Sequence, residues 1–389
     1  MKILLTVDCC QNQINGVNNS VKILADELKK RGNDVRILAL SENLKSQIID
    51  DSYYIPSFNC TMIYPGTRMA FYLDNKIRKE IEKWKPDIIH TQTEFYTYKI
   101  AKKLSIKLNI PMVHTLHTMY EDYYRYFSSN EKISKEIIYK IIYSFLKKTN
   151  YLIVPSDKVK NKILKYGDIT TNIEVIPTGI NINYYQKNID ENERKILLKK
   201  YGIQNDDIIL LSVSRIGKEK NIEELIEILR KLIIKNNKFK LMIVGDGPNK
   251  KNLEHKVHKE NLDKNIIFTG MISFNEIYKY YEIGNIFVSA STSETQGLTY
   301  VEALASGLPL VCRNDECLKN IIFDSNGYKY ETIEEAVREI ISIASDKKKL
   351  KNMAKNSAEI SNKFSKENFA KKVENEYIKI LKIKNIFEK

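Results

Sequence analysis

Two glutamates, Glu294 and Glu302, stand eight residues apart in the segment of this chain whose residue types carry the most chemistry. Gly297 lies between them, a helix is predicted to follow it, and Ser-Gly-Leu-Pro then leads into an apolar run. A glycine lets backbone N–H groups approach a phosphate, and a helix N-terminus favours negative charge. Each carboxylate accepts hydrogen bonds from a diol. The pattern predicts a site for a nucleotide sugar; a surface helix that happens to hold two glutamates is the alternative.

Two cations, Arg215 and Lys220, follow the first predicted strand in the second half of the chain. They lie in the loop that opens the next predicted helix, where the carboxyl end of a parallel strand delivers ligand contacts. Fixed cations there neutralise a diphosphate, and arginine binds one bidentately. A solvated basic loop is the alternative. Gly245 lies in a tight turn after the next predicted strand, which is either a close approach to the nucleotide or an ordinary strand-to-helix turn.

The spacing Glu-x7-Glu, followed by Ala-Leu-Ala-Ser-Gly-Leu-Pro, resembles the donor-site signature of retaining glycosyltransferases of family 4, which have the GT-B fold. The resemblance covers nearly the whole chain. The string Ser293–Tyr300 is similar to a narrower branch, the bacterial enzymes that glucosylate diacylglycerol. The resemblance implies that Arg215 and Lys220 stabilise the departing nucleotide diphosphate. It also implies that Glu294 contacts the transferred sugar and that Glu302 binds the ribose hydroxyls.

The same resemblance implies further contacts around the donor. His117 matches a family histidine that reaches the donor sugar. Gly16 borders the donor phosphates, although Asn15 replaces the second glycine of many relatives. The remaining donor contacts to phosphate, sugar or base are expected from Gly245, Met271, Gly297 and Leu298.

The elements that position these residues are short β-branched runs that alternate with longer amphipathic ones. The strand-like runs are 2–7, 35–40, 88–90, 112–115, 151–154 and 173–176, then 208–213, 240–244, 266–268, 286–289 and 309–311. Continuous apolar strands separated by helices predict parallel sheets covered on both faces. Two such series predict an α/β chain of two doubly wound, Rossmann-like domains that face each other across a cleft, as in GT-B enzymes.

A turn at 177–179 marks the predicted boundary between the two series. Residues 1–178 are expected to form an acceptor-binding domain and residues 179–365 a nucleotide-sugar-binding domain. Apolar residues repeat every four positions from Phe369 to Leu381, which predicts a helix in 366–389. By resemblance, this helix packs back on the N-terminal domain.

The composition bounds the partners. The 389 residues suffice for two cores, and 63 Lys and Arg against 49 Asp and Glu give a formal charge of +14. Such an excess favours nucleic acid or an anionic membrane surface, and a low-GC coding bias explains it equally well. No nucleic-acid-binding motif is present, so nucleic acid is not an expected partner. An odd cysteine count, no signal peptide and no apolar run of ~18–20 residues predict a cytoplasmic protein, peripheral on the inner face of the cell membrane.

The acceptor side is predicted in the first half of the chain. His90, at a strand end, and the pair Tyr120 and Asp122 resemble the lipid-glucosylating branch, although a plain loop surface is the alternative. The stretch 67–85, with Arg68 and Trp84, is basic and amphipathic, as is a second stretch at 132–148. The first stretch faces either a membrane or its own sheet, and the second is expected to face its sheet.

Together these features predict a retaining transfer of a hexose from UDP-glucose to a membrane lipid such as diacylglycerol. The same donor chemistry on a saccharide or polyprenyl-linked acceptor, for cell-surface glycans, is the nearest alternative. A GT-B nucleotide-sugar epimerase is another, but its acid and base carboxylates are not found. UDP-glucose is the expected co-substrate, and no bound cofactor or metal is expected because Asp246, Asp315 and Glu316 are isolated.

Overall fold

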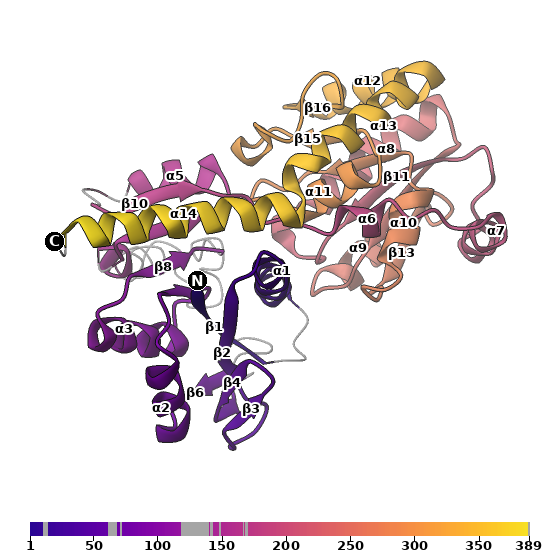
Figure 1. Ribbon diagram of the computed structural model, residues 1–389. Helices are drawn as coiled ribbons and strands as arrows, with labels where there is room; N and C mark the ends of the chain where they lie inside the picture. The colour runs from indigo at the N-terminus through magenta and orange to yellow at the C-terminus, as the bar shows by residue number, and fades with distance from the viewer. Residues whose placement is uncertain are drawn as a thin grey trace. The chain divides into compact units, whose positions relative to one another are not determined.

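The computed structural model describes residues 1–10, 15–60, 68–70, 72–117, 140, 143–147, 149–165, 167 and 170–387. The chain divides into two compact units, residues 1–179 together with 366–389, and residues 180–365. The last helix, yellow in Figure 1, therefore belongs to the same unit as the indigo and violet N-terminal elements. Each unit is described separately below.

The first unit is built on an eight-stranded sheet with the order β10-β9-β8-β7-β1-β2-β4-β3. Its strands are β1 (Lys2–Cys10), β2 (Asp34–Leu40), β3 (Gln47–Ile49), β4 (Ser52–Ile55), β7 (Ile88–Thr91), β8 (Met112–Thr115), β9 (Tyr151–Val154) and β10 (Asn172–Val175). All neighbours are parallel except β3 and β4. A separate antiparallel pair is formed by β5 (Ser57–Asn59) and β6 (Arg68–Ala70).

Helices cover both faces of this sheet because successive side chains of a strand point to opposite sides. Ile3 and Leu5 of β1 pack in a core with α1 (Gly16–Lys30) and α14 (Lys366–Phe387). Leu4 points the other way, into a core with α2 (Asn75–Trp84) and α3 (Tyr96–Leu108). A smaller core joins α5 (Asp157–Leu164) to β9 and includes Leu146, which is fully buried.

Within the stretch 67–85, the apolar side chains of α2 face the core that α2 and α3 form with the sheet. Ile77, Ile81 and Trp84 of α2 are all buried against the sheet. The Trp84 indole is 7% exposed, and its Nε1–H donates to Asp34 at 2.7 Å. The guanidinium of Arg36 lies 4.5 Å from the ring centroid. The expectation that Trp84 contacts a membrane is therefore wrong, because both the polar and the apolar part of the indole are used inside the unit.

The second unit holds a six-stranded sheet, all parallel, with the order β13-β12-β11-β14-β15-β16. Its strands are β11 (Ile208–Val213), β12 (Phe239–Val244), β13 (Ile266–Gly270), β14 (Ile286–Ser289), β15 (Leu310–Arg313) and β16 (Gly327–Tyr330). The chain leaves β11 for β12 on one side and later places β14 on the other. The carboxyl ends of β11 and β14 thus flank the topological switch point, where open α/β sheets bind ligands.

Both faces of the second sheet are also covered. Leu210 of β11 joins a core with α8 (Ile222–Lys235), α9 (Lys250–Lys259) and α12 (Ile333–Ala344). Leu211 joins the opposite core, with α6 (Ile182–Tyr185), α7 (Glu191–Lys200), α10 (Ile277–Ile283) and α11 (Leu298–Ala305), while α13 (Lys347–Ser361) packs beside α11 (Figure 1). Two doubly wound α/β units are thus confirmed. No described helix is long and apolar enough to cross a membrane.

Candidate active site

The corner between β14 and α11 holds the two predicted carboxylates and the glycine between them. Gly297 has φ +73°, a left-handed conformation, and precedes the first residue of α11. A Cβ at this position would lie 2.3 Å from the ring of Tyr300, so only glycine fits. Leu298 then starts the helix, so the first N–H groups of α11 follow Glu294 by only a few residues, and no N-cap side chain bonds them. This arrangement suits an anion bound beside Glu294.

The structure brings Lys220 to Glu294 across 74 residues of sequence. The Lys220 ammonium donates a hydrogen bond to the Glu294 carboxylate, and each side chain is only 19% exposed. Lys220 ends a short 3-10 turn, Lys218–Lys220, after β11, and Arg215 lies exposed at the start of the same loop. Two predicted site residues therefore already neutralise each other, and the second cation lies beside the switch point of the sheet.

Glu302 is held by a tyrosine that the sequence analysis missed. The Tyr281 hydroxyl, on α10, donates to Glu302 Oε2 at 2.7 Å. Burial raises the pKa of Glu302, while hydrogen bonds from the hydroxyls of Tyr281 and Tyr185 oppose that rise. A half-buried carboxylate whose pKa is raised by desolvation depends on such donors to stay ionised. No spacing pattern links these tyrosines to Glu302, since they come from different helices.

Gly245 and Met271 directly follow the neighbouring strands β12 and β13. Gly245 has φ +137°, and its N–H donates to the Gly270 carbonyl at 3.1 Å. A Cβ on Gly245 would lie 2.0 Å from the carbonyl oxygen of Ser214, so packing alone requires glycine here. Met271 follows β13 and is 75% exposed. Met271 is thus accessible to a ligand, while the glycine is explained by the turn itself.

In the first unit, Gly16 opens α1 next to a residue that caps the helix. Asn15 is the N-cap, and its side chain accepts a hydrogen bond from the Asn18 N–H at 2.8 Å. Asparagine is among the best N-cap residues because its oxygen satisfies one of the first N–H groups. Asn15 in place of a second glycine therefore has a structural reason, and the loop before it lies outside the described residues.

A ladder of polar contacts joins the end of β7 to β8. His90 is 1% exposed, with Nδ1 at 2.5 Å from the Tyr377 hydroxyl and Nε2 at 2.7 Å from Thr115 Oγ1. Burial lowers the pKa of His90 well below its usual value. Both ring nitrogens are thus occupied inside the unit. The expectation that His90 lines the acceptor side is corrected, since its ring belongs to the core between α14 and β8.

The next contacts of the ladder involve the other two histidines. Thr91 Oγ1 lies 2.7 Å from His114 Nδ1, and His114 is fully buried. Gln92 Oε1 lies 2.8 Å from His117 Nε2. His117 is only partly exposed, and burial lowers the pKa of its imidazole to about 4. His117 is therefore neutral at pH 7. Its partner Gln92 was not a predicted site residue.

Asp8 is a second polar group that the sequence analysis missed. It lies near the end of β1, and its carboxylate accepts from Thr93 Oγ1 at 2.7 Å and from the Thr97 N–H at 2.9 Å. Burial raises the pKa of Asp8, and these hydrogen bonds oppose the rise. Because Thr97 lies in the first turn of α3, Asp8 ties β1 to the start of that helix.

Arg68, another predicted acceptor residue, makes its contacts within its own loop region. The Arg68 guanidinium donates to Ser57 Oγ at 2.8 Å and to the Glu42 carbonyl at 2.7 Å, so it fastens the β5–β6 pair. Tyr120 and Asp122 lie outside the described residues. Among the residues that the structure describes, no group of three His, Cys, Asp or Glu side chains could hold a metal ion.

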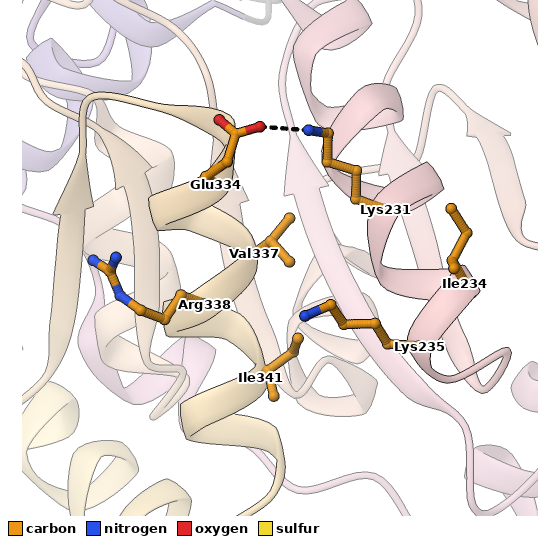
Figure 2. A pocket seen from close by; sticks show the side chains of 7 residues that line it. All are labelled: Lys231, Ile234, Lys235, Glu334, Val337, Arg338 and Ile341. Carbon is orange, nitrogen blue, oxygen red and sulfur yellow. Dashed lines mark hydrogen bonds and ion pairs between the residues drawn. The ribbon is translucent and has the colours of Figure 1, made fainter.

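A groove on the second unit lies apart from all of these residues. It runs between α8 and α12, and Figure 2 shows the Lys231–Glu334 ion pair across it. Ile234, which is 81% exposed, stands on its rim. None of the predicted site residues lines this groove, so it is not the donor site.

Known protein families match both α/β units, and individual relatives match most of the chain. The family description Glycosyltransferase Family 4 matches residues 14–184, and Glycosyl transferases group 1 matches residues 193–360. Alpha-monoglucosyldiacylglycerol synthase of Acholeplasma laidlawii is 33% identical over 385 residues, 95% of this chain and 94% of that protein. The enzyme of the same name from Streptococcus pneumoniae is 35% identical over 326 residues, 83% of this chain and 74% of that protein.

A solved structure extends the comparison to the fold. HepE of Anabaena, in complex with UDP-glucose, matches with a TM-score of 0.71 at 16% identity, over 96% of this chain and 98% of its own. The two family matches fall on the two α/β units in order, and the relatives above match along most of their length. The chain belongs to the glycosyltransferases of the GT-B fold and is a hexosyltransferase.

Proposed function

We propose that this enzyme transfers glucose from UDP-glucose to a lipid hydroxyl, such as that of diacylglycerol, with retention of the anomeric configuration. The Lys220–Glu294 pair beside the left-handed Gly297 carries the donor half of this proposal. It joins a cation for a diphosphate, a carboxylate for sugar hydroxyls and a helix N-terminus in one corner. The names of the two synthases that match most of the chain support the acceptor half.

The reaction requires a diphosphate to leave while positive charge builds on the sugar ring. Lys220 and Arg215 stabilise the departing diphosphate, together with the N–H groups that open α11. Glu294 accepts hydrogen bonds from the sugar, and Glu302 from the ribose. We assign no protein nucleophile, and the leaving diphosphate accepts the proton of the attacking hydroxyl. His117, neutral at pH 7, contacts the sugar.

The ion pair has a consequence for donor binding. Without ligand, the charge of Lys220 is neutralised by Glu294, and both side chains are largely shielded from water. A bound diphosphate offers Lys220 a second anion, and sugar hydroxyls offer Glu294 new donors. The donor thus replaces one contact with two, so that neither charge is left uncompensated in the site.

For the membrane side, we propose the groove between α2 and α3 in the first unit. Its floor is apolar, with Leu73, Ile100 and Leu104. Exposed cations on its walls come from both helices: Arg78, Lys99, Lys103 and Lys107. The three lysines are spaced four residues apart and so share one face of α3. Glu82 pairs with Arg78 and Lys107, which leaves a net positive rim suited to anionic lipid headgroups on the inner face of the membrane.

The test incubates the protein with radiolabelled UDP-glucose and vesicles of phosphatidylglycerol that contain diacylglycerol, followed by extraction into organic solvent. Label in the lipid phase, retained in the sugar as an α-linked glucose and lost in Glu294→Ala, is the expected result. Label released only as free glucose would keep the donor and remove the lipid acceptor. Label transferred only to added saccharide would favour the alternative acceptor class. Triple replacement of Lys99, Lys103 and Lys107 by glutamate should release the protein from vesicles in a flotation assay while leaving UDP binding unchanged.

A further inference from the structure

The side chain of Gln92, directly after β7, is buried with only one end of its amide hydrogen-bonded to described residues. Its side chain is 2% exposed, and its Oε1 lies 2.8 Å from His117 Nε2. The other end of the amide, Nε2, is buried and has no hydrogen-bond partner among the described residues. A buried amide donor without a partner destabilises the folded state, so a native structure keeps one only for a reason.

Hydrogen bonds hold Gln92 and the residues on both sides of it, so the point from which the Gln92 side chain extends is fixed. The Gln92 N–H donates to the Thr6 carbonyl of β1 at 2.9 Å. Thr91 before it bonds His114 of β8, and Thr93 after it bonds Asp8 of β1. Gln92 is therefore held by two neighbouring strands at the carboxyl edge of the sheet, where the ligands of such sheets bind.

We propose that Gln92 is the positioning residue for His117: its side-chain carbonyl accepts the Nε2–H and holds the imidazole as the Nε2–H tautomer. The ring is thereby fixed in one tautomer and one orientation for its contact with the transferred sugar. The Gln92 Nε2–H groups supply a donor to an oxygen at the same place. The ligand contact rests on the proposed function; the tautomer does not.

The surroundings of His117 fit a neutral ring fixed in this way. Burial is the main cause that lowers the pKa of His117 to about 4. The charged and titratable groups that act on it are Glu94, which raises that pKa, and His114, which lowers it. His114 is itself paired with Glu94 at 3.3 Å. An amide at the Gln92 position is uncharged, so it orients the ring without favouring imidazolium, as a carboxylate would.

The first measurement is the ¹⁵N spectrum of the full-length protein labelled at histidine, which has only five such residues. Long-range ¹H–¹⁵N couplings identify each tautomer, and His117→Gln assigns the His117 signals by their loss. At pH 7 we expect the neutral Nε2–H form for His117. Finding the Nδ1–H form, or an imidazolium, would overturn the proposal.

Two variants and a control complete the test. In Gln92→Leu the preference for one tautomer should disappear, and in the nearly isosteric Gln92→Glu the His117 pKa should rise by at least one unit from about 4 because a carboxylate faces the ring. Gln47→Leu makes the same change on β3, at the far edge of the same sheet, and should leave the spectrum of His117 unaltered. An unchanged His117 spectrum in both Gln92 variants would contradict the proposal.

Kinetics then separate the proposal from the function on which its ligand contact rests. If vesicles accept glucose, Gln92→Leu should lower kcat/KM by about tenfold or more, and Gln92→Glu should lose activity increasingly as imidazolium forms below its new pKa. A fixed tautomer in an enzyme that does not use UDP-glucose would refute the proposed donor and leave the positioning intact. A fixed tautomer with unchanged kinetics in Gln92→Leu would overturn the ligand contact.

Discussion

The two units prepare their polar groups in opposite ways. In the second unit, the site holds a charged pair, Lys220 and Glu294, that remains partly open to water. In the first unit, the ladder between β7 and β8 is buried, and the pKa values of His90 and His117 are lowered so that both rings are neutral. The difference follows the chemistry proposed for each: a diphosphate needs cations, whereas a neutral imidazole in the other unit can contact a sugar hydroxyl without adding charge. The predictions below test this contrast between a charged and a neutral half.

The largest effect is expected from the charged half. Lys220→Ala should lower kcat by about 10²–10³-fold, because it removes a fixed cation from the developing negative charge of the leaving diphosphate. Lys218→Ala, in the same 3-10 turn but exposed, is the matched control and should remain active. The measurement is initial rate of lipid glucosylation at saturating UDP-glucose. Equal losses in both variants would show that the turn, and not the Lys220 charge, matters.

Because His117 in the first unit is held neutral, the free energy of unfolding should depend on pH. The folded-state pKa of His117, about 4, lies below its unfolded value, so the unfolded chain binds more protons at mildly acidic pH and stability falls as pH falls. Between pH 7 and 5 wild type should lose about 2 kcal/mol of unfolding free energy relative to His117→Gln. Urea titrations at both pH values measure this difference. An identical pH slope in the two proteins would mean that His117 is not held neutral.

The ion pair can be opened without removing the cation. Glu294→Gln frees Lys220 from its carboxylate, so the affinity for UDP, which lacks the sugar, should rise by about tenfold while glucose transfer falls. Isothermal titration with UDP measures the first effect and the vesicle assay the second. Weaker UDP binding would show instead that Glu294 holds Lys220 in place for the diphosphate, and the two halves would then differ less than described.

The smallest effect concerns Glu302, the half-buried carboxylate of the charged half. Tyr281→Phe removes a donor that opposes the raised pKa of Glu302, so that pKa should rise further. Because the ionised form accepts the ribose hydroxyls, the acidic loss of UDP affinity should move to higher pH in the variant. Affinity at pH 8 should fall only about threefold. A pH profile of UDP binding that coincides with wild type would remove Tyr281 from this role.

The strands of the central sheets could be predicted from sequence because their apolar runs are continuous. Runs such as 2–7 and 208–213 lie inside β1 and β11. Two of the missed strands, β16 and β3, lie at sheet edges, where one side is unpaired and apolar content is lower. The prediction that Trp84 contacts a membrane failed for a different reason. A basic helix with an apolar stripe looks the same whether the stripe faces a lipid or its own sheet, and only the packing of α2 decides.

The site was predictable as far as it follows a short linear pattern. Glu294, Gly297 and Glu302 share one segment: Glu294 precedes α11, Gly297 is its N-cap and Glu302 lies in its second turn. The contacts Lys220–Glu294, Tyr281–Glu302 and Gln92–His117 join residues 21–74 positions apart, which no local spacing encodes. These contacts set the charge state and orientation of the predicted groups, so the sequence indicates which residues matter more readily than what holds them.

The Tyr377–His90 contact has a consequence for the order in which the molecule is made. Tyr377, Phe369 and Val373 of α14 complete the core of the first unit, yet they are translated after the whole of the 180–365 segment. During synthesis, the 1–179 segment therefore has part of one face of its sheet uncovered beside α1, and His90 lacks its Tyr377 partner for Nδ1. The 180–365 segment forms a compact unit by itself, so it can finish folding before α14 is made. A premature stop near residue 365 would therefore damage the half of the protein that was translated earliest.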